Sequence, residues 1–149
     1  MPTRLLTIAD LPALDDLGSL SDSEGFRFVR RFIDDITNGR ARLDSPCEFF
    51  LANTIDERLV GFGGVTTDPY VEDPRVGRLR HLYIRPEVRG TGIGRALVAQ
   101  LEGRAEGCYT QLRLRTDTLA AARFYERLGY EAIASDSATH QRVLPPPSM

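Results

Sequence analysis

The chain has 149 residues, of which 42% are hydrophobic and 27% are charged. This length and balance suit one soluble domain with a buried core, and no apolar run is long enough to span a membrane, so no membrane partner is expected. All 19 basic residues are arginines; they lie among 21 acidic residues, the net charge is −2, and nucleic-acid binding is therefore not expected.

The start of the chain and its two cysteines bear on the compartment. The first residues lack the basic, apolar and small-residue order of a secretory signal, so we expect a cytoplasmic protein. Cys47 and Cys108 lie far apart in the sequence, and in that compartment two reduced core thiols are favoured over a disulfide. No cluster of histidine, cysteine and acidic residues is visible, which predicts no metal site.

The first half of the chain predicts two helices, a hairpin and a further strand. Apolar residues recur at helical spacing in the first two segments and alternate with polar residues in the strands. A loop rich in proline and acidic residues, residues 68–75, leads to the last strand. The predicted helices span residues 9–20 and 23–42, and the predicted strands span residues 47–55, 59–67 and 76–84.

The second half continues the alternation of helix and strand. Helices are predicted over residues 92–106 and 119–128, and strands over residues 111–116, 130–134 and 139–144. The order of elements is that of a mixed α/β domain, which we expect to be a single unit over residues 1–144. The proline-rich tail, residues 145–149, cannot join a strand ladder and is expected to fray.

Three glycines, Gly90, Gly92 and Gly94, lie where a predicted strand ends and a helix begins. The first turn of a helix has amide groups without intrahelical partners and a partial positive charge, which together favour a bound anion. Glycine lets a phosphate approach the backbone closely, and Arg89 and Arg95 add charge. The turn is therefore predicted to bind a phosphate or a pyrophosphate.

Spacing separates this turn from two other phosphate loops. A Walker loop ends in Gly-Lys-Ser/Thr, whereas Gly94 is followed by Arg95 and Ala96. The dinucleotide fingerprint G-x-G-x-x-G fails, because its third glycine position is occupied by Arg95 or Leu97. A tight turn that binds no ligand remains the alternative.

Two motifs resemble those of one known family. Arg89-x-x-Gly92-x-Gly94, two residues after Leu-Tyr-Ile-Arg-Pro at residues 82–86, resembles the acyl-CoA pyrophosphate loop of the GNAT superfamily of N-acetyltransferases. Residues 121–130, Ala-Ala-Arg-Phe-Tyr-Glu-Arg-Leu-Gly-Tyr, resemble its second signature. The resemblance implies a mixed α/β fold with a twisted, mostly antiparallel sheet of about six or seven strands flanked by about four helices.

The resemblance also implies a cofactor site. Backbone groups of Leu82 and Ile84 would bind the pantetheine arm and the acetyl carbonyl like an added strand. Thr118 stands where the family often has asparagine, which puts that side-chain contact in doubt. The cofactor-binding residues that the resemblance implies are Leu82, Tyr83, Ile84, Arg89, Gly90, Thr91, Gly92, Ile93, Gly94, Arg95, Thr118, Ala121 and Phe124.

The implied reaction is transfer of an acetyl group from acetyl-CoA to a primary amine of a small molecule or peptide, by direct attack in a ternary complex that releases coenzyme A. The amide of Leu82 would stabilise the oxyanion, and Tyr125 would face the leaving sulfur. Full proton transfer from a tyrosine to a thiolate is uphill by about 2 kcal/mol, so Tyr125 is expected to donate a hydrogen bond or relay a proton. A core tyrosine is the alternative interpretation.

The general base is not determined by the sequence. Strict alternation places Arg78 and Arg80 on the face of Leu82 and Ile84, where many relatives carry glutamate, and arginine cannot accept a proton near neutral pH. His81 can, although alternation directs it to the opposite face unless a one-residue bulge intervenes. An ordered water is the other candidate.

The acceptor and the assembly are likewise open. Arg78 and Arg80 would favour an amine that bears an anionic group, whereas the acidic residues Asp68, Glu72 and Asp73 would favour a cationic one. A module that binds acyl-CoA without catalysis is the alternative function, and a homodimer is one expected assembly.

Overall fold

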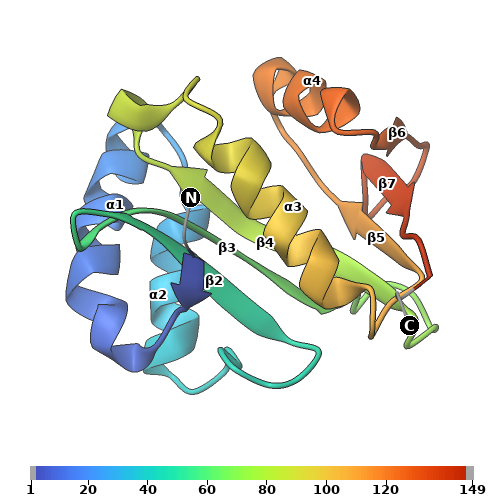
Figure 1. Cartoon of the computed structure of the whole chain (residues 1–149), viewed down its shortest axis with the longest axis horizontal. Helices are drawn as coiled ribbons and strands as arrows, with labels where there is room; N and C mark the ends of the chain where they lie inside the picture. Colours follow the sequence, from blue (N-terminus) through green and yellow to red (C-terminus); the bar gives the residue numbers. More distant parts are fainter. Residues whose placement is uncertain (1–2, 147–149) are drawn as a thin grey trace.

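The computed structural model describes residues 3–146 and has a seven-stranded sheet in the order β1-β2-β3-β4-β5-β7-β6 (Figure 1). Only β4 and β5 pair in parallel; the other neighbours are antiparallel. The strands are β1 (Thr3–Leu5), β2 (Phe49–Ile55), β3 (Arg58–Thr67), β4 (Val76–Ile84), β5 (Gln111–Leu114), β6 (Glu131–Ala132) and β7 (His140–Val143). The helices are α1 (Leu11–Ser23), α2 (Phe28–Thr37), α3 (Ile93–Ala105) and α4 (Leu119–Arg127), with single 3₁₀ turns at Ile8–Asp10 and Pro86–Val88. This is the fold class that the sequence predicts.

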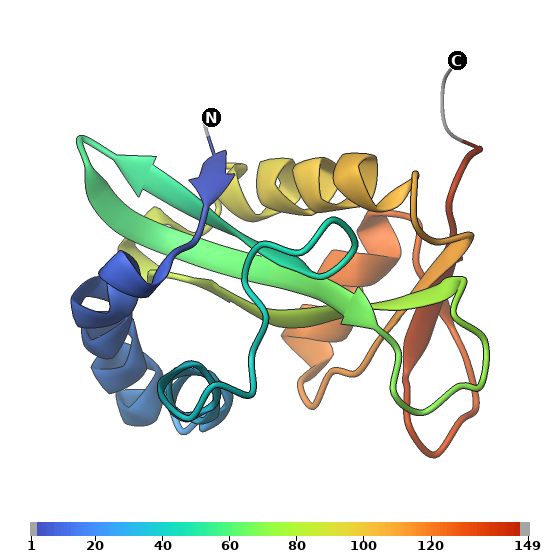
Figure 2. The same ribbon diagram turned by 90° about the horizontal axis from the view of Figure 1, so that it is seen from below.

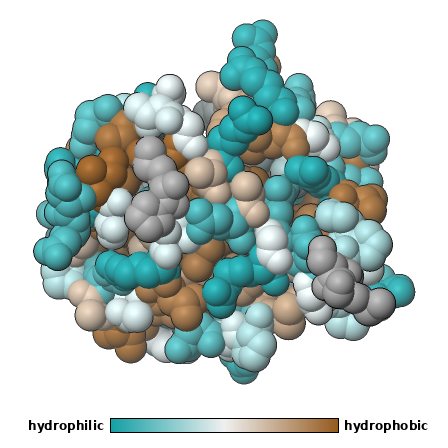
Figure 3. Space-filling model, viewed as in Figure 1, coloured by the Kyte–Doolittle hydropathy of each residue, from teal (hydrophilic) through white to brown (hydrophobic). Residues whose placement is uncertain are grey.

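Helices cover the sheet on both faces. The pair α1 and α2 packs on one face and α3 on the other (Figure 2), so the strands are buried between two cores. Phe32 of α2 and Phe62 of β3 belong to the first core, and Leu97 of α3 and Leu112 of β5 to the second. On the face that carries α3, hydrophobic and hydrophilic residues are intermixed (Figure 3).

Several element bounds differ from the sequence prediction, and glycines explain two of them. The second predicted helix, residues 23–42, is shortened at both ends to α2, because Gly25 at φ +87° separates α1 from α2 and Gly39 at φ +73° follows the end of α2. Strand β1, which was not predicted, is three residues long and pairs only with β2. Pro145 and Pro146 lie outside helices and strands, and the rest of the predicted tail, residues 147–149, lies outside the described residues.

The prediction of two reduced thiols is wrong, because Cys47 and Cys108 form a disulfide. The loop before β2 runs beside the C-terminal end of α3, which brings the two Cα atoms to 5.7 Å. The hydroxyl of Tyr109 donates a hydrogen bond to the carbonyl of Cys47 (2.6 Å) at the same place. A separation of 61 residues in the sequence carries no sign of this meeting.

Residues 3–146 contain neither a membrane-spanning helix nor a cluster of metal-ligating side chains. No helix in this range has the length and apolarity needed to cross a membrane. No three His, Cys, Asp or Glu side chains in it gather as a metal site would require.

Candidate active site

The glycine turn forms the N terminus of α3, as the sequence predicts. Gly90 and Gly92 have φ values of +80° and +89°, a conformation that glycine adopts without strain. Gly92 caps the helix without a side-chain hydrogen bond, and the first backbone bond runs from the Ala96 amide to the Gly92 carbonyl (3.0 Å). Helix geometry therefore leaves the amides of Ile93, Gly94 and Arg95 without intrahelical partners, so this end of α3 suits an anion.

Helix α4 reaches the same turn through Phe124. A Cβ atom placed on Gly94 would lie 3.3 Å from Phe124 Cζ and 3.7 Å from Ile84 Cγ1. A side chain at position 94 would therefore crowd Phe124 and make an ordinary contact with Ile84, and glycine allows Phe124 to approach closely. The end of β4, the start of α3 and the predicted second signature on α4 meet at one point.

The sheet opens beside this point. Strands β4 and β5 pair only over Val76–Arg78 and Gln111–Arg113, so the rest of β4 has no strand partner on its β5 side. The amide of Arg85 donates to Val60 of β3 (2.8 Å), and backbone groups alternate in direction along a strand. The amides of Ile84 and, by the same alternation, Leu82 therefore face the opening.

A bulge in β4 changes which side chains share a face. Between the pairs Phe62–Tyr83 and Gly64–Arg80, β4 has two residues where β3 has one, and His81 adopts φ +58°. Strict alternation is consequently wrong across this position. Leu82 and Ile84 pack toward α3, whereas Arg78 and Arg80, which precede the bulge, do not.

Leu82 and Ile84 belong to the core under α3, together with Leu79. Arg78 and Arg80 lie on the opposite face of β4 from Leu82 and Ile84, on the side of α2. The prediction that these arginines share a face with Leu82 and Ile84 is therefore corrected, because the bulge shifts the alternation by one residue.

His81 is also on the α2 side, in a stack of aromatic rings. Its ring centroid is 4.8 Å from that of Phe32 and 6.0 Å from that of Phe50. Burial, assisted by the charge of Arg80, lowers the pKa of His81 to about 4. The imidazole is thus neutral at pH 7 and a weak base, so it is poorly suited to take a proton from an ammonium group.

Tyr125 differs from the other buried tyrosines. The hydroxyls of Tyr83, Tyr109 and Tyr130 donate hydrogen bonds to Glu24, Cys47 O and Glu102, respectively. The Tyr125 hydroxyl has no hydrogen-bond partner among residues 3–146, and burial raises the pKa of Tyr125. A buried tyrosine hydroxyl usually finds a partner, so Tyr125 is a phenol with its donor free for a ligand.

The side chain of Arg89 binds other groups of the protein. Its Nε donates to the Ile84 carbonyl (2.9 Å), and its two terminal nitrogens donate to the carboxylate of Glu24 (2.6 and 2.8 Å). This bidentate pair lowers the pKa of Glu24. Arg89 therefore fixes the turn to the end of α1, and Glu24 is a site residue that sequence reasoning missed, since nothing local marks it.

The remaining predicted residues have local roles. The hydroxyl of Thr118 caps α4 by accepting a hydrogen bond from the Ala121 amide (3.1 Å), and that of Thr91 donates to the Val88 carbonyl (2.5 Å). Arg95 is exposed on the first turn of α3. Thr118 thus uses its oxygen within the protein, at the position where the family's asparagine was expected to contact the cofactor.

These features define a class: an α/β protein with an anion-binding helix N terminus beside an opening in its sheet. The model of the Acetyltransferase (GNAT) family matches residues 13–130, and the chain belongs to this family.

Relatives agree with this assignment. Mycothiol acetyltransferase of Streptomyces coelicolor is 38% identical over 96 residues, which are 61% of this chain and 29% of that protein. A crystal structure of a candidate acetyltransferase from Exiguobacterium has a TM-score of 0.79 and 26% identity, covering 96% of this chain and 94% of the other. A GNAT-family N-acetyltransferase of Escherichia coli in complex with CoA has a TM-score of 0.73 and 20% identity, covering 97% of this chain and 81% of the other.

Proposed function

We propose that the protein transfers an acetyl group from acetyl-CoA to a primary amine of a small molecule or peptide, by direct attack in a ternary complex. The observation that carries this proposal is the position of the turn. Gly90 and Gly92 present free amides at the N terminus of α3, beside the unpaired edge of β4. Membership of the acetyltransferase family supports the same chemistry.

The backbone supplies the binding groups for acetyl-CoA, which when bound provides an activated acetyl group as a thioester. The amides at residues 92–95 hold the pyrophosphate. The space beside Gly90 and Gly92 is open, because neither residue has a side chain and no other atom lies within 4 Å of a Cβ placed on either. The free edge of β4 binds the pantetheine arm through Leu82 and Ile84. The carbonyl of Ile84 already accepts from Arg89, so its amide is the group that remains available.

Two groups act on the developing charges. The Leu82 amide faces the opening and stabilises the negative charge that forms on the acetyl oxygen. Tyr125 donates its free hydroxyl to the departing sulfur; its raised pKa makes it a donor that keeps its proton. The low pKa of His81 favours water as the group that removes the proton from the amine.

Thiol release from acetyl-CoA across a panel of amines tests this proposal. Tyr125→Phe is expected to lower kcat about 100-fold while leaving the affinity for CoA unchanged, because the lost hydroxyl has no hydrogen-bond partner among residues 3–146. Tyr130→Phe is the matched control: it loses the 2.8 Å hydrogen bond to Glu102 and about 1 kcal/mol of stability but keeps its kcat.

A module that binds acyl-CoA without catalysis is the second candidate, and the absence of an effective base at Arg78, Arg80 and His81 favours it. It predicts thermal stabilisation by CoA but no thiol release with any amine. That result, or equal rates for Tyr125→Phe and the parent protein, would overturn the proposed reaction.

A further inference from the structure

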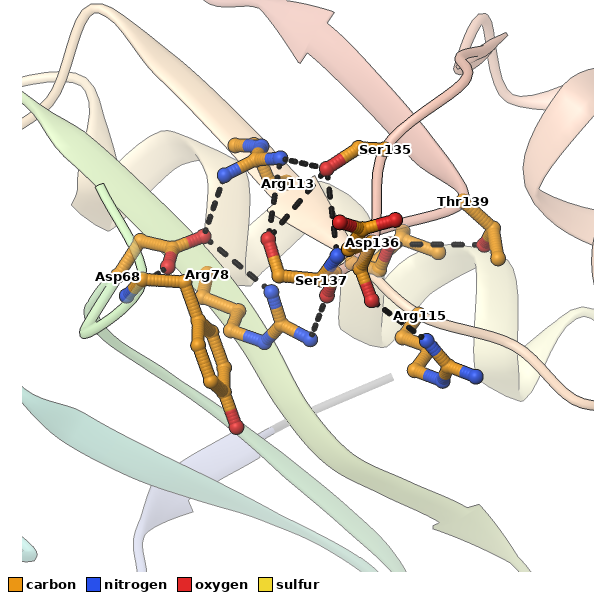
Figure 4. Close-up of polar contacts among 10 residues, drawn as sticks. Asp68, Arg78, Arg113, Arg115, Ser135, Asp136, Ser137 and Thr139 are labelled. Carbon is orange, nitrogen blue, oxygen red and sulfur yellow. Dashed lines mark hydrogen bonds and ion pairs between the residues drawn. The ribbon is translucent and has the colours of Figure 1, made fainter.

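An arginine cluster lies on the α2 side of the sheet, outside the turn assigned to acetyl-CoA. Asp68, just after β3, is fully buried between Arg78 of β4 and Arg113 of β5 (Figure 4). Its Oδ2 lies 3.3 Å from Arg78 Nη1 and 3.6 Å from Arg113 Nη1. One carboxylate thus faces two guanidinium groups, so the cluster keeps an excess positive charge.

The other contacts of the cluster orient the guanidinium groups without neutralising them. Arg78 donates to the carbonyl of Ser137 (2.7 Å), and Arg113 donates to the hydroxyls of Ser135 (2.9 Å) and Ser137 (3.4 Å). All of these acceptors are neutral and lie in the loop between β6 and β7 (Figure 4). Both arginines are therefore held in place and remain positively charged.

Arg80, two residues further along β4, is the member without a partner. It is half-buried, and among residues 3–146 its guanidinium has no hydrogen bond and no ion pair. Burial and the charge of Arg78 lower its pKa, while Tyr70, Asp35 and Asp68 oppose that shift.

Both nearby carboxylates already have arginine partners. Asp35 accepts a hydrogen bond from Arg40 (3.0 Å), and Asp68 is shared by the two buried arginines. A guanidinium stays charged at neutral pH, and its partial burial without a partner costs free energy. A ligand that brings an anion would supply this partner.

The position of Arg80 connects it with the reaction. It precedes Leu82 by two residues, about 7 Å along a strand. A molecule of amino-acid size can place its amine at the thioester and its anion at Arg80. The ring centroid of Tyr70 lies 4.9 Å from the Arg78 guanidinium carbon, and Tyr70 is 65% exposed. A ligand at the cluster can therefore also contact an aromatic ring.

We propose that the acceptor is an amine that carries a carboxylate, a compound of the amino-acid class, and that Arg80 determines this specificity by binding the carboxylate. The inference rests on the proposed acetyl transfer. One uncommitted guanidinium fork matches one planar carboxylate through two parallel hydrogen bonds. The excess charge of the Asp68 cluster attracts the same anion and disfavours polycationic acceptors.

The activity test compares kcat/KM for a panel of amino acids and their carboxamides, at equal concentrations of free amine. The parent protein is expected to prefer the acids. Arg80→Gln should lower kcat/KM for the acids about 10- to 100-fold and leave kcat/KM for the carboxamides unchanged. Arg80→Lys, which keeps the charge without the fork, should retain an intermediate preference.

Arg75→Gln is the matched control, because Arg75 is exposed and paired with Asp73 in the loop before β4. It should alter neither rate. Equal or faster turnover of the carboxamides by the parent protein, or an unchanged preference in Arg80→Gln, would overturn the inference while leaving acetyl transfer established.

A binding measurement separates this inference from the proposed function. Calorimetry with N-acetyl amino acids and their carboxamides, in the presence of CoA, should detect tighter binding of the acids to the parent protein and no difference for Arg80→Gln. This comparison decides the inference even if no amine is acetylated. Equal affinities for acid and carboxamide in the parent protein would contradict it.

Discussion

The two sides of β4 present different chemistry at one opening in the sheet. On the α3 side the candidate cofactor-binding groups are main-chain amides, those around Gly92 and that of Leu82, and they carry no formal charge. On the α2 side the candidate groups are charged side chains: Arg80, which has no partner among residues 3–146, and two further arginines around buried Asp68. A main-chain site changes little when side chains change, whereas a side-chain site changes with each substitution. The first suits a shared cofactor and the second a particular acceptor.

The largest expected effect is the loss of stability when the disulfide at the C-terminal end of α3 is removed. The disulfide between Cys47 and Cys108 closes a loop of 61 residues, so its removal should lower the free energy of unfolding by about 4 kcal/mol. Urea unfolding with and without reductant measures this difference. The double variant Cys47→Ser/Cys108→Ser should have the same free energy of unfolding as the reduced protein, with or without reductant. An equal free energy of unfolding for the oxidised and the reduced parent protein would contradict a stabilising disulfide.

A pH titration should produce the next largest effect, on the α2 side. The pKa of His81 is about 4 in the folded protein and about 6.5 in an unfolded chain, so the unfolded state binds the proton more readily. The stability from neutral His81 is complete above pH 6.5 and is lost as the pH falls toward 4, by about 3 kcal/mol in all.

Urea unfolding between pH 7 and pH 4 checks this loss. His81→Asn keeps a residue that tolerates the positive φ but does not titrate, so most of the slope with pH should disappear. A smaller slope at lower pH should remain from carboxylates with lowered pKa values, such as Glu24. Full retention of the slope in His81→Asn would show that the ring does not titrate as described.

The smallest effect is expected on the α3 side, where the turn is held by little packing. In Gly92→Ala the new Cβ meets no atom within 4 Å, but the positive φ of this position is strained for alanine. Because little packing holds the turn in place, its backbone should relax to a negative φ and move the amides. We expect about a tenfold loss of affinity for CoA, measured by calorimetry. Gly103→Ala, in the interior of α3, is the control and should bind CoA normally; a normal affinity in Gly92→Ala would break the assignment of the turn.

Much of the fold and part of the site could be predicted because the signals are local. Strand β4 lies at its predicted bounds, since a loop rich in proline and acidic residues precedes it and the glycine turn follows it. The turn around Gly92 was predicted from glycines and a change of period within a few residues. The pairing of Arg89 with Glu24 was not predicted, because the two residues are 65 positions apart and neither is marked by its neighbours.

The sequence by itself determined the order of the elements, the family and the glycine turn at the N terminus of α3, because each depends on residues that are neighbours along the chain. Only the tertiary structure decided the bulge at His81, the side of β4 on which Arg80 lies, the meeting of Arg78 and Arg113 at Asp68, and the disulfide. Those features depend on strand register and on packing between distant segments. A shift of one residue in register moves every later side chain to the other face, and no local pattern records it.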